Sequence, residues 1–218
     1  MNLNTNNISV GRKIILMQII FVTSIILANI VGIKIINVFS LNVSMGIWLI
    51  PITFLITDVL AEVKGRKFVS NLIWSTAIAL IFSFLFIQLS ILIAPAERFA
   101  ENNPAFVTIF KNSSRMFIAS VIAFIISQFH DIWAFEFWKK KTKGKYLWLR
   151  NNLSTIVSQF IDTTIFIFIA FYQMTPKFDF AFMWQLILPY YTLKVILAII
   201  DTPFAYLGIR WLKGKEDA

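Results

Sequence analysis

Long apolar stretches alternate with short polar and basic segments along the whole chain. A transmembrane α-helix needs about 20 mostly apolar residues, and six windows of the sequence meet that requirement. Their approximate bounds are 14–33, 43–63, 68–94, 116–138, 147–172 and 183–207. The pattern therefore predicts an all-α integral membrane protein with six transmembrane helices, which form a single transmembrane domain over residues 1–218.

Composition supports the membrane assignment. Of the 218 residues, 58% are hydrophobic and only 14% are charged, whereas soluble domains carry about 25% charged residues. The chain has no cysteine and a single histidine, so a disulfide, a cysteine metal site and a zinc site of several histidines are excluded. We expect no catalytic residues, no metal and no cofactor, and a multi-pass location in a membrane.

The distribution of basic residues predicts the orientation. Fourteen of the 20 Lys and Arg residues lie before the first window, after the second, after the fourth or after the sixth, and five lie on the other side. Cytoplasmic loops carry the excess of Lys and Arg, so both termini are predicted to be cytoplasmic. The net charge of +9 then reflects orientation and contact with anionic lipid headgroups rather than nucleic acid. A homo-oligomer is possible.

Ionisable residues inside the predicted spans are the main functional signal. A charge in a span is costly and usually faces a cavity or a partner. Apart from Arg150 at the start of the fifth window, the charged residues that fall within the windows are Asp58, Glu62, Asp131, Glu136, Asp162, Lys194 and Asp201. Some of them could simply hold helices together. The whole set favours a polar path or binding site within the membrane.

A pentapeptide occurs twice, as SQFHD at 127–131 and as SQFID at 158–162. Gln and Asp three residues apart share one face of a helix, and the two copies lie on predicted spans of opposite direction. We predict that Gln128, Asp131, Gln159 and Asp162 line a substrate site between these spans. A carboxylate and an amide match the hydrogen-bonding edge of a guanine-like base. The aromatic residues that flank these positions are Phe129, Trp133, Phe160 and Tyr190. They could stack on such a base, but the stronger interpretation is that most of them face lipid or pack between helices.

Further polar residues complete the predicted site. Lys194 is expected to point into the central cavity, to pair with an acid from another helix and to contact a carbonyl of the substrate. Asn29 and Arg150 are assigned to the same binding site.

A gate is predicted at the cytoplasmic end of the second span. Asp58 and Glu62 lie one helical turn apart and are followed by Arg66. We predict that these three residues form an inner gate, although a static ion pair with Arg66 is the alternative.

Two long segments carry a family resemblance. PITFLITDVLAEVKGRK at 51–67 and YLWLRNNLSTIVSQFIDTTIFIFIAF at 146–171 resemble the hallmark segments of bacterial queuosine-precursor transporters, a family of small inner-membrane proteins also described as vitamin-uptake transporters. The shorter match QFHD at 128–131 agrees, whereas family members often carry an aromatic residue at the position of Val63. The resemblance implies uptake of 7-deazaguanines such as preQ0, preQ1 or queuine, through six spans with both ends inside. It implies neither an energy source nor a binding pose.

Other functions stay open on the sequence alone. The leading reading is a secondary or facilitative transporter. The chain could instead be the substrate-binding subunit of an energy-coupling, ATP-driven vitamin transporter, which would require ATPase partners. An intramembrane enzyme lacks support because no nucleophile–base pair or metal cluster stands out in the sequence. An assembly or scaffold subunit would tolerate neutral substitutions at the membrane-embedded acids.

Overall fold

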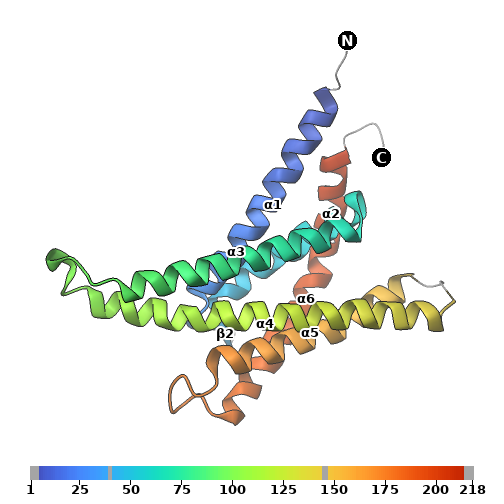
Figure 1. Ribbon diagram of the computed structural model, residues 1–218. Helices are drawn as coiled ribbons and strands as arrows, with labels where there is room; N and C mark the ends of the chain where they lie inside the picture. Colours follow the sequence, from blue (N-terminus) through green and yellow to red (C-terminus); the bar gives the residue numbers. More distant parts are fainter. Residues whose placement is uncertain (1–4, 39–40, 144–146, 214–218) are drawn as a thin grey trace.

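The computed structural model describes residues 5–38, 41–143 and 147–213, and helices dominate it (Figure 1). The six helices are α1 (Thr5–Val31), α2 (Ile50–Lys64), α3 (Arg66–Leu92), α4 (Asn103–Lys141), α5 (Leu147–Phe171) and α6 (Phe180–Lys213). Two short 3-10 helices, η1 (Met45–Leu49) and η2 (Glu97–Phe99), precede α2 and α4. The expected all-α membrane fold is confirmed in this respect.

A small antiparallel hairpin between α1 and η1 was not predicted. Its strands are β1 (Ile35–Val38) and β2 (Leu41–Ser44), and Ile35 pairs with Ser44. The Ser44 hydroxyl donates to the carbonyl of Gly32 at 2.7 Å and accepts from the backbone N–H of Gly46 at 3.2 Å. The hairpin displaces the start of α2 to Ile50, where the proline at the beginning of the helix needs no hydrogen-bond partner.

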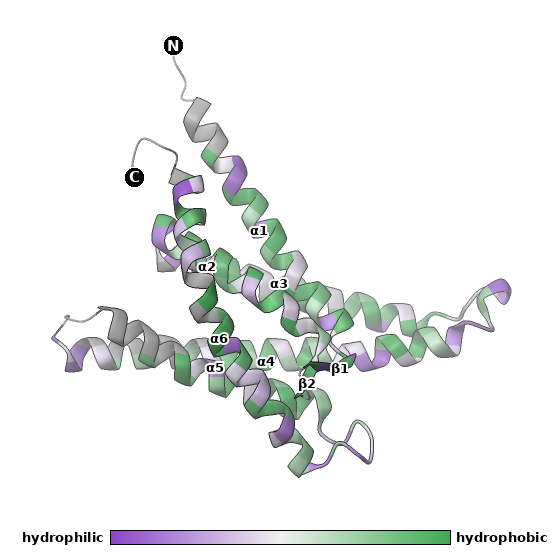
Figure 2. Ribbon diagram, turned by 180° about the vertical axis from the view of Figure 1, so that it is seen from behind, coloured by the Kyte–Doolittle hydropathy of each residue, from purple (hydrophilic) through white to green (hydrophobic). Residues whose placement is uncertain are grey.

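Apolar surfaces face outward along the helices, as in a protein solvated by lipid. Five helical segments of the described chain are long and apolar enough to cross a membrane: Val10–Val31, Met45–Lys64, Lys67–Leu92, Asn103–Ser127 and Phe180–Leu197. A shorter apolar helix covers Ile156–Phe171. Figure 2 shows hydrophobic residues along the helix bodies and hydrophilic residues gathered at the helix ends and loops. The chain is therefore a multi-pass membrane protein.

The fourth helix is longer than a membrane span. The sequence predicted a span over 116–138, whereas α4 continues without interruption from Asn103 to Lys141. At 1.5 Å per residue its 39 residues extend about 58 Å, nearly twice the hydrocarbon core of a bilayer. Residues 103–115, which precede the predicted span, are thus part of α4, which lies beside α3 (Figure 1).

Two apolar clusters hold opposite ends of the bundle. The first joins α1, α2, α3 and α6, and its fully buried members include Val59, Leu60 and Leu212. The second joins β2, η1, α4, α5 and α6, and it includes Ile167 and Ile187. On α6 the two clusters are separated by the segment that carries Lys194. Burial of apolar side chains drives the packing at both ends and leaves a polar layer between them.

The first and last helices meet at one end of the molecule. The Lys13 ammonium donates to the carbonyl of Trp211 at 2.6 Å and lies 4.9 Å from the centre of that residue's indole ring. Nearby, α2 and α6 cross closely at Gly208, where a Cβ atom would lie only 2.7 Å from Cγ2 of Val59. The start of α1 and the end of α6 therefore lie on the same side of the bundle.

Candidate functional site

A buried ion pair lies in the polar layer between α5 and α6. The Nζ atom of Lys194 lies 3.0 Å from Oδ2 of Asp162, and the two side chains are 6% and 23% exposed. Lys194 also donates to Oε1 of Gln159 at 3.5 Å. The prediction that Lys194 pairs with an acid from another helix is confirmed, and that acid is Asp162; its position in a central cavity stays a prediction. The ammonium does not extend to a lipid headgroup.

Neighbouring groups complete the surroundings of the pair. The Ser127 hydroxyl, on α4, donates to Oδ1 of Asp162 at 3.4 Å. Lys194 Nζ lies 5.4 Å from the centre of the Tyr190 ring, within the range of a cation–π interaction. Asp162 is thus held from two sides, by α4 and by α6. Partnering of this kind offsets the cost of placing a carboxylate and an ammonium within a membrane.

The two copies of the repeated pentapeptide face each other, as predicted from their occurrence on antiparallel helices. Ser127 and His130 of the first copy contact Asp162 and Ser158 of the second, since His130 Nδ1 lies 2.9 Å from the Ser158 hydroxyl. Hydrogen bonds therefore link the copies between α4 and α5, and Lys194 extends the network to α6. The Ser and His positions of the first copy make these contacts.

Five of the predicted site residues have side chains outside the described part of the structure. Their positions are Asp58, Arg66, Gln128, Asp131 and Arg150.

Glu62 and Asn29 lie apart from the ion pair. The side chain of Glu62 is exposed near the end of α2. Asn29 is buried, and its amide donates to the carbonyl of Ile25 at 2.8 Å and accepts from the Ser120 hydroxyl at 2.5 Å. In these contacts Asn29 links α1 to α4. Its role in binding a substrate stays a prediction.

The aromatic residues that flank the motifs divide into two groups. Phe129 and Trp133 are each 63% exposed on the outer face of α4, which agrees with the interpretation that most of the flanking aromatic residues face lipid or pack between helices. These two residues follow the lipid-facing side of the helix because the Ser127 and His130 side chains occupy its inner side. Tyr190 is buried beside Lys194, and Phe160 packs edge-on against Tyr191.

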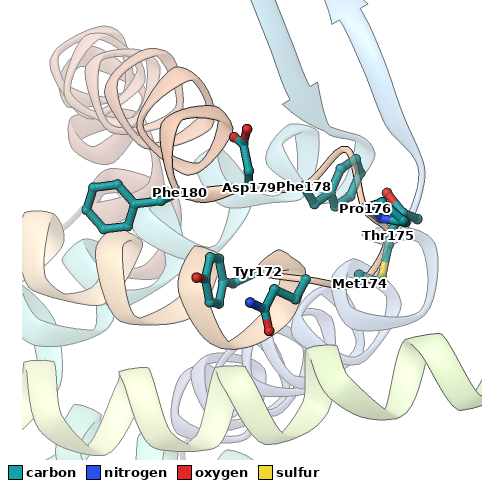
Figure 3. A pocket seen from close by; sticks show the side chains of 8 residues that line it. Tyr172, Met174, Thr175, Pro176, Phe178, Asp179 and Phe180 are labelled. Carbon is teal, nitrogen blue, oxygen red and sulfur yellow. The ribbon is translucent and has the colours of Figure 1, made fainter.

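An open hollow of about 390 Å³ lies at the α5–α6 loop, lined by Tyr172, Gln173, Met174, Thr175, Pro176, Phe178, Asp179 and Phe180 (Figure 3). Arg115 of α4 braces this loop through hydrogen bonds to the carbonyls of Ile169 at 3.1 Å and Tyr172 at 2.7 Å. A cation at the C-terminal end of a helix also stabilises the helix dipole. The hollow and the Lys194–Asp162 pair share no lining residue.

Sequence reasoning missed Thr163, which follows Asp162 directly. Its side chain is fully buried, and its hydroxyl has no hydrogen-bond partner among the described residues. Thr163 is one helical turn from Gln159 and therefore shares its face of α5. The only sequence signal was its place beside the repeated motif.

A multi-pass helical bundle with a buried Lys–Asp pair and adjacent amide and hydroxyl groups has the features of a membrane transporter. A comparison with known protein families identifies the family of this chain. Residues 44–208 match the family described as "Putative vitamin uptake transporter", and the chain belongs to that family. It is accordingly a transporter of the inner membrane.

A curated relative supports the same class. The chain is 28% identical over 191 residues, or 87% of its own length and 81% of the relative's, to the "Probable queuosine precursor transporter" of Bacillus subtilis (strain 168). No solved structure matches the chain.

Proposed function

We propose that this protein takes up 7-deazaguanine precursors of queuosine, such as preQ0, preQ1 or queuine, as a secondary or facilitative transporter. The observation that carries the proposal is the buried contact of Lys194 with Asp162 and Gln159 in the polar layer of the bundle. The family and the name of the Bacillus subtilis relative support the substrate class.

The chemistry of the three side chains matches one edge of such a base. An ionised carboxylate accepts two N–H groups, as presented by the ring nitrogen and exocyclic amine of a guanine-like molecule. The amide of Gln159 and the ammonium of Lys194 can donate to the ring carbonyl. In this conformation the Lys194 ammonium is paired with the Asp162 carboxylate, so the base must displace the ammonium in order to bind the carboxylate. Lys194 then moves from the carboxylate to the carbonyl of the ligand. Gln128, Asp131, Asn29 and Arg150 belong to the same proposed binding set.

Transport also requires that the site open to each side in turn. We assign Asp58, Glu62 and Arg66 to an inner gate, next to the first apolar cluster. Six spans with both termini in the cytoplasm are part of the proposal. The contact between Lys13 and Trp211 supports this topology because an even number of spans returns the chain to its starting side.

Reporter fusions test the topology. Reporters fused at Lys143 and after the last residue are expected to report cytoplasm, and a reporter at Asn102 the outside. An outside signal at Lys143 would contradict the six-span arrangement.

The function is tested in a host that lacks both queuosine synthesis and its own precursor transporter. Expression of this chain, with each 7-deazaguanine supplied in the medium, is expected to restore queuosine in the transfer RNA. Variants Asp162→Asn and Lys194→Met should abolish the signal at equal membrane abundance. Restored queuosine in either variant would contradict the proposed site. Uptake by the purified chain alone in proteoliposomes excludes a requirement for ATPase partners.

A further inference from the structure

We propose that His130 binds a proton together with each molecule of the transported base, so that a proton gradient drives uptake. The inference rests on the proposed function and deepens it, because it names the coupling ion and the residue that carries this ion. Its starting point is the one position at which the two copies of the pentapeptide differ.

The copies SQFHD and SQFID differ only in their fourth residue, which is His130 in the first copy and Ile161 in the second. His130 is the single histidine of the chain. Histidine ordinarily gains or loses its proton between pH 5 and 8, which no other residue of either copy does. An ionisable residue within a transmembrane segment marks a functional site, proton relays included. The first copy therefore has a proton-binding group that the second copy lacks.

His130 lies close to the buried ion pair. Its Nδ1 atom is 2.9 Å from the Ser158 hydroxyl of α5, and its side chain is half-buried. On α4, His130 follows Ser127, which donates to Asp162, by three residues. On α5, Ser158 precedes Asp162 by four residues. The imidazole and the carboxylate are therefore about one helical turn apart, or roughly 5–6 Å along the helix axes.

Asp162 is the acid that bears on the charge of His130 among the described side chains of the helices that pack against α4. These helices are α1, α3 and α5. Beyond Asp162 lie Lys194 and Tyr190 of α6. On α4 itself the nearest acids in sequence are Asp131 and Glu136, whose side chains are outside the described part of the chain. The other ionisable residues of α1, α3 and α5 are basic and belong to the N-terminal parts of these helices: Arg12, Lys13, Arg66, Lys67 and Arg150.

The proposed displacement of Lys194 links the proton to the base. In the described conformation the Asp162 carboxylate and the Lys194 ammonium compensate each other. When a neutral base binds the carboxylate and Lys194 turns to the carbonyl of the base, the carboxylate loses its direct counter-ion. A negative charge nearby favours the protonated form of a histidine. The base and the proton then bind cooperatively, each raising the affinity for the other.

The local hydrogen bonding can accommodate the proton. A protonated imidazole donates from both ring nitrogens, and a hydroxyl oxygen accepts. The Ser158 oxygen is already within hydrogen-bonding distance of Nδ1. Protonation of His130 therefore keeps the contact between α4 and α5 in place.

The first experiment measures the proton on the unmodified protein. Isotope-labelled histidine gives a single imidazole whose nitrogen signals distinguish the neutral from the protonated ring. The purified protein in lipid nanodiscs is followed over a pH series with and without preQ0. The protonated fraction should be larger with preQ0 throughout the transition. A pH indicator in weakly buffered solution should record the uptake of protons when preQ0 is added.

The second experiment measures accumulation in proteoliposomes whose membrane potential is held at zero. With an exterior one pH unit more acidic than the interior, the wild type should accumulate preQ0 up to about tenfold. One proton per base supplies about 1.4 kcal/mol under that gradient, which corresponds to a factor of ten. His130→Gln retains hydrogen-bonding groups for Ser158 but cannot be protonated. Any uptake by this variant should therefore only equalise the two concentrations and move no protons.

Ser114→Ala is the matched control. It also removes a side-chain contact between α4 and a neighbouring helix, because the Ser114 hydroxyl donates to Oε1 of Gln88 on α3 at 3.0 Å. Ser114 and His130 lie about 24 Å apart along α4. Ser114→Ala should accumulate preQ0 as the wild type does.

Three results overturn the inference. In the first, the wild type equalises preQ0 but does not accumulate it under the pH difference. In the second, His130→Gln accumulates preQ0 as the wild type does, and in the third the imidazole is equally protonated with and without preQ0. In each of these cases the proposed function stands, and only the role of His130 is wrong.

The remaining outcomes are also decisive. If His130→Gln takes up no base at all, the wild-type accumulation and the imidazole signals decide the question, since neither needs a variant. If the wild type neither binds nor takes up preQ0, the proposed function fails, and the inference fails with it.

Discussion

Breaking the ion pair between Lys194 and Asp162 separates its structural from its functional contribution. Lys194→Met keeps a side chain of similar length and removes the charge. Asp162 would then retain the Ser127 hydroxyl at 3.4 Å as its described partner. Removing one partner of a buried ion pair typically costs about 3–5 kcal/mol, because a charge is left uncompensated. Asp162 is 23% exposed, so water reduces this cost and we expect the lower end of that range.

A loss of about 3 kcal/mol corresponds to a fall in melting temperature of roughly 6–12 °C for a chain of this size. The measurement is thermal unfolding of the purified protein in nanodiscs. Lys111→Met is the matched control, since Lys111 is an exposed lysine on α4. It should leave the melting temperature and uptake near wild type.

The double variant Lys194→Met, Asp162→Asn removes both charges and should recover most of the lost stability, since a neutral replacement of a buried pair is often tolerated. Uptake should stay absent because the ammonium and the carboxylate that are proposed to bind the ligand have been removed. Wild-type stability in the single variant would refute the electrostatic argument. Uptake by the double variant would refute the assignment of the pair to the substrate site.

Three further predictions concern packing and helix contacts, each measured by thermal unfolding. Gly208→Ala should cost about 1–3 kcal/mol by overpacking against α2, whereas Gly11→Ala, with open space around its Cβ position, should be neutral or stabilising. Equal effects would contradict a close crossing. Arg115→Ala should cost about 1–3 kcal/mol, because two carbonyls at the end of α5 lose a donor, and should speed protease cleavage of the α5–α6 loop. An unchanged cleavage rate would contradict the role of Arg115 in holding this loop. Ser120→Ala should cost about 1–3 kcal/mol through the lost contact with Asn29, and wild-type stability would show that this bond contributes little.

The sequence by itself determined that the protein is a helical membrane protein, because repeated apolar runs of about 20 residues are unfavourable in water and favourable in lipid. It also located the polar layer, since charges such as Asp162 and Lys194 are tolerated within spans only when they have partners. The repeated pentapeptide even indicated which helices would meet. All of these features are local properties of the chain or properties of its periodicity.

Only the tertiary structure decided which groups pair. Lys194 could have paired with several acids, and its choice of Asp162 depends on how α5 and α6 pack. Phe129 and Trp133 flank the site in sequence but face outward, because helical phase directs neighbouring residues to different sides. The pairing of residues 35–38 with 41–44, and the Thr163 hydroxyl without a partner among the described residues, were equally hidden. The first depends on backbone hydrogen bonds that no hydrophobic periodicity marks, and the second on which groups the neighbouring helices bring within hydrogen-bonding distance.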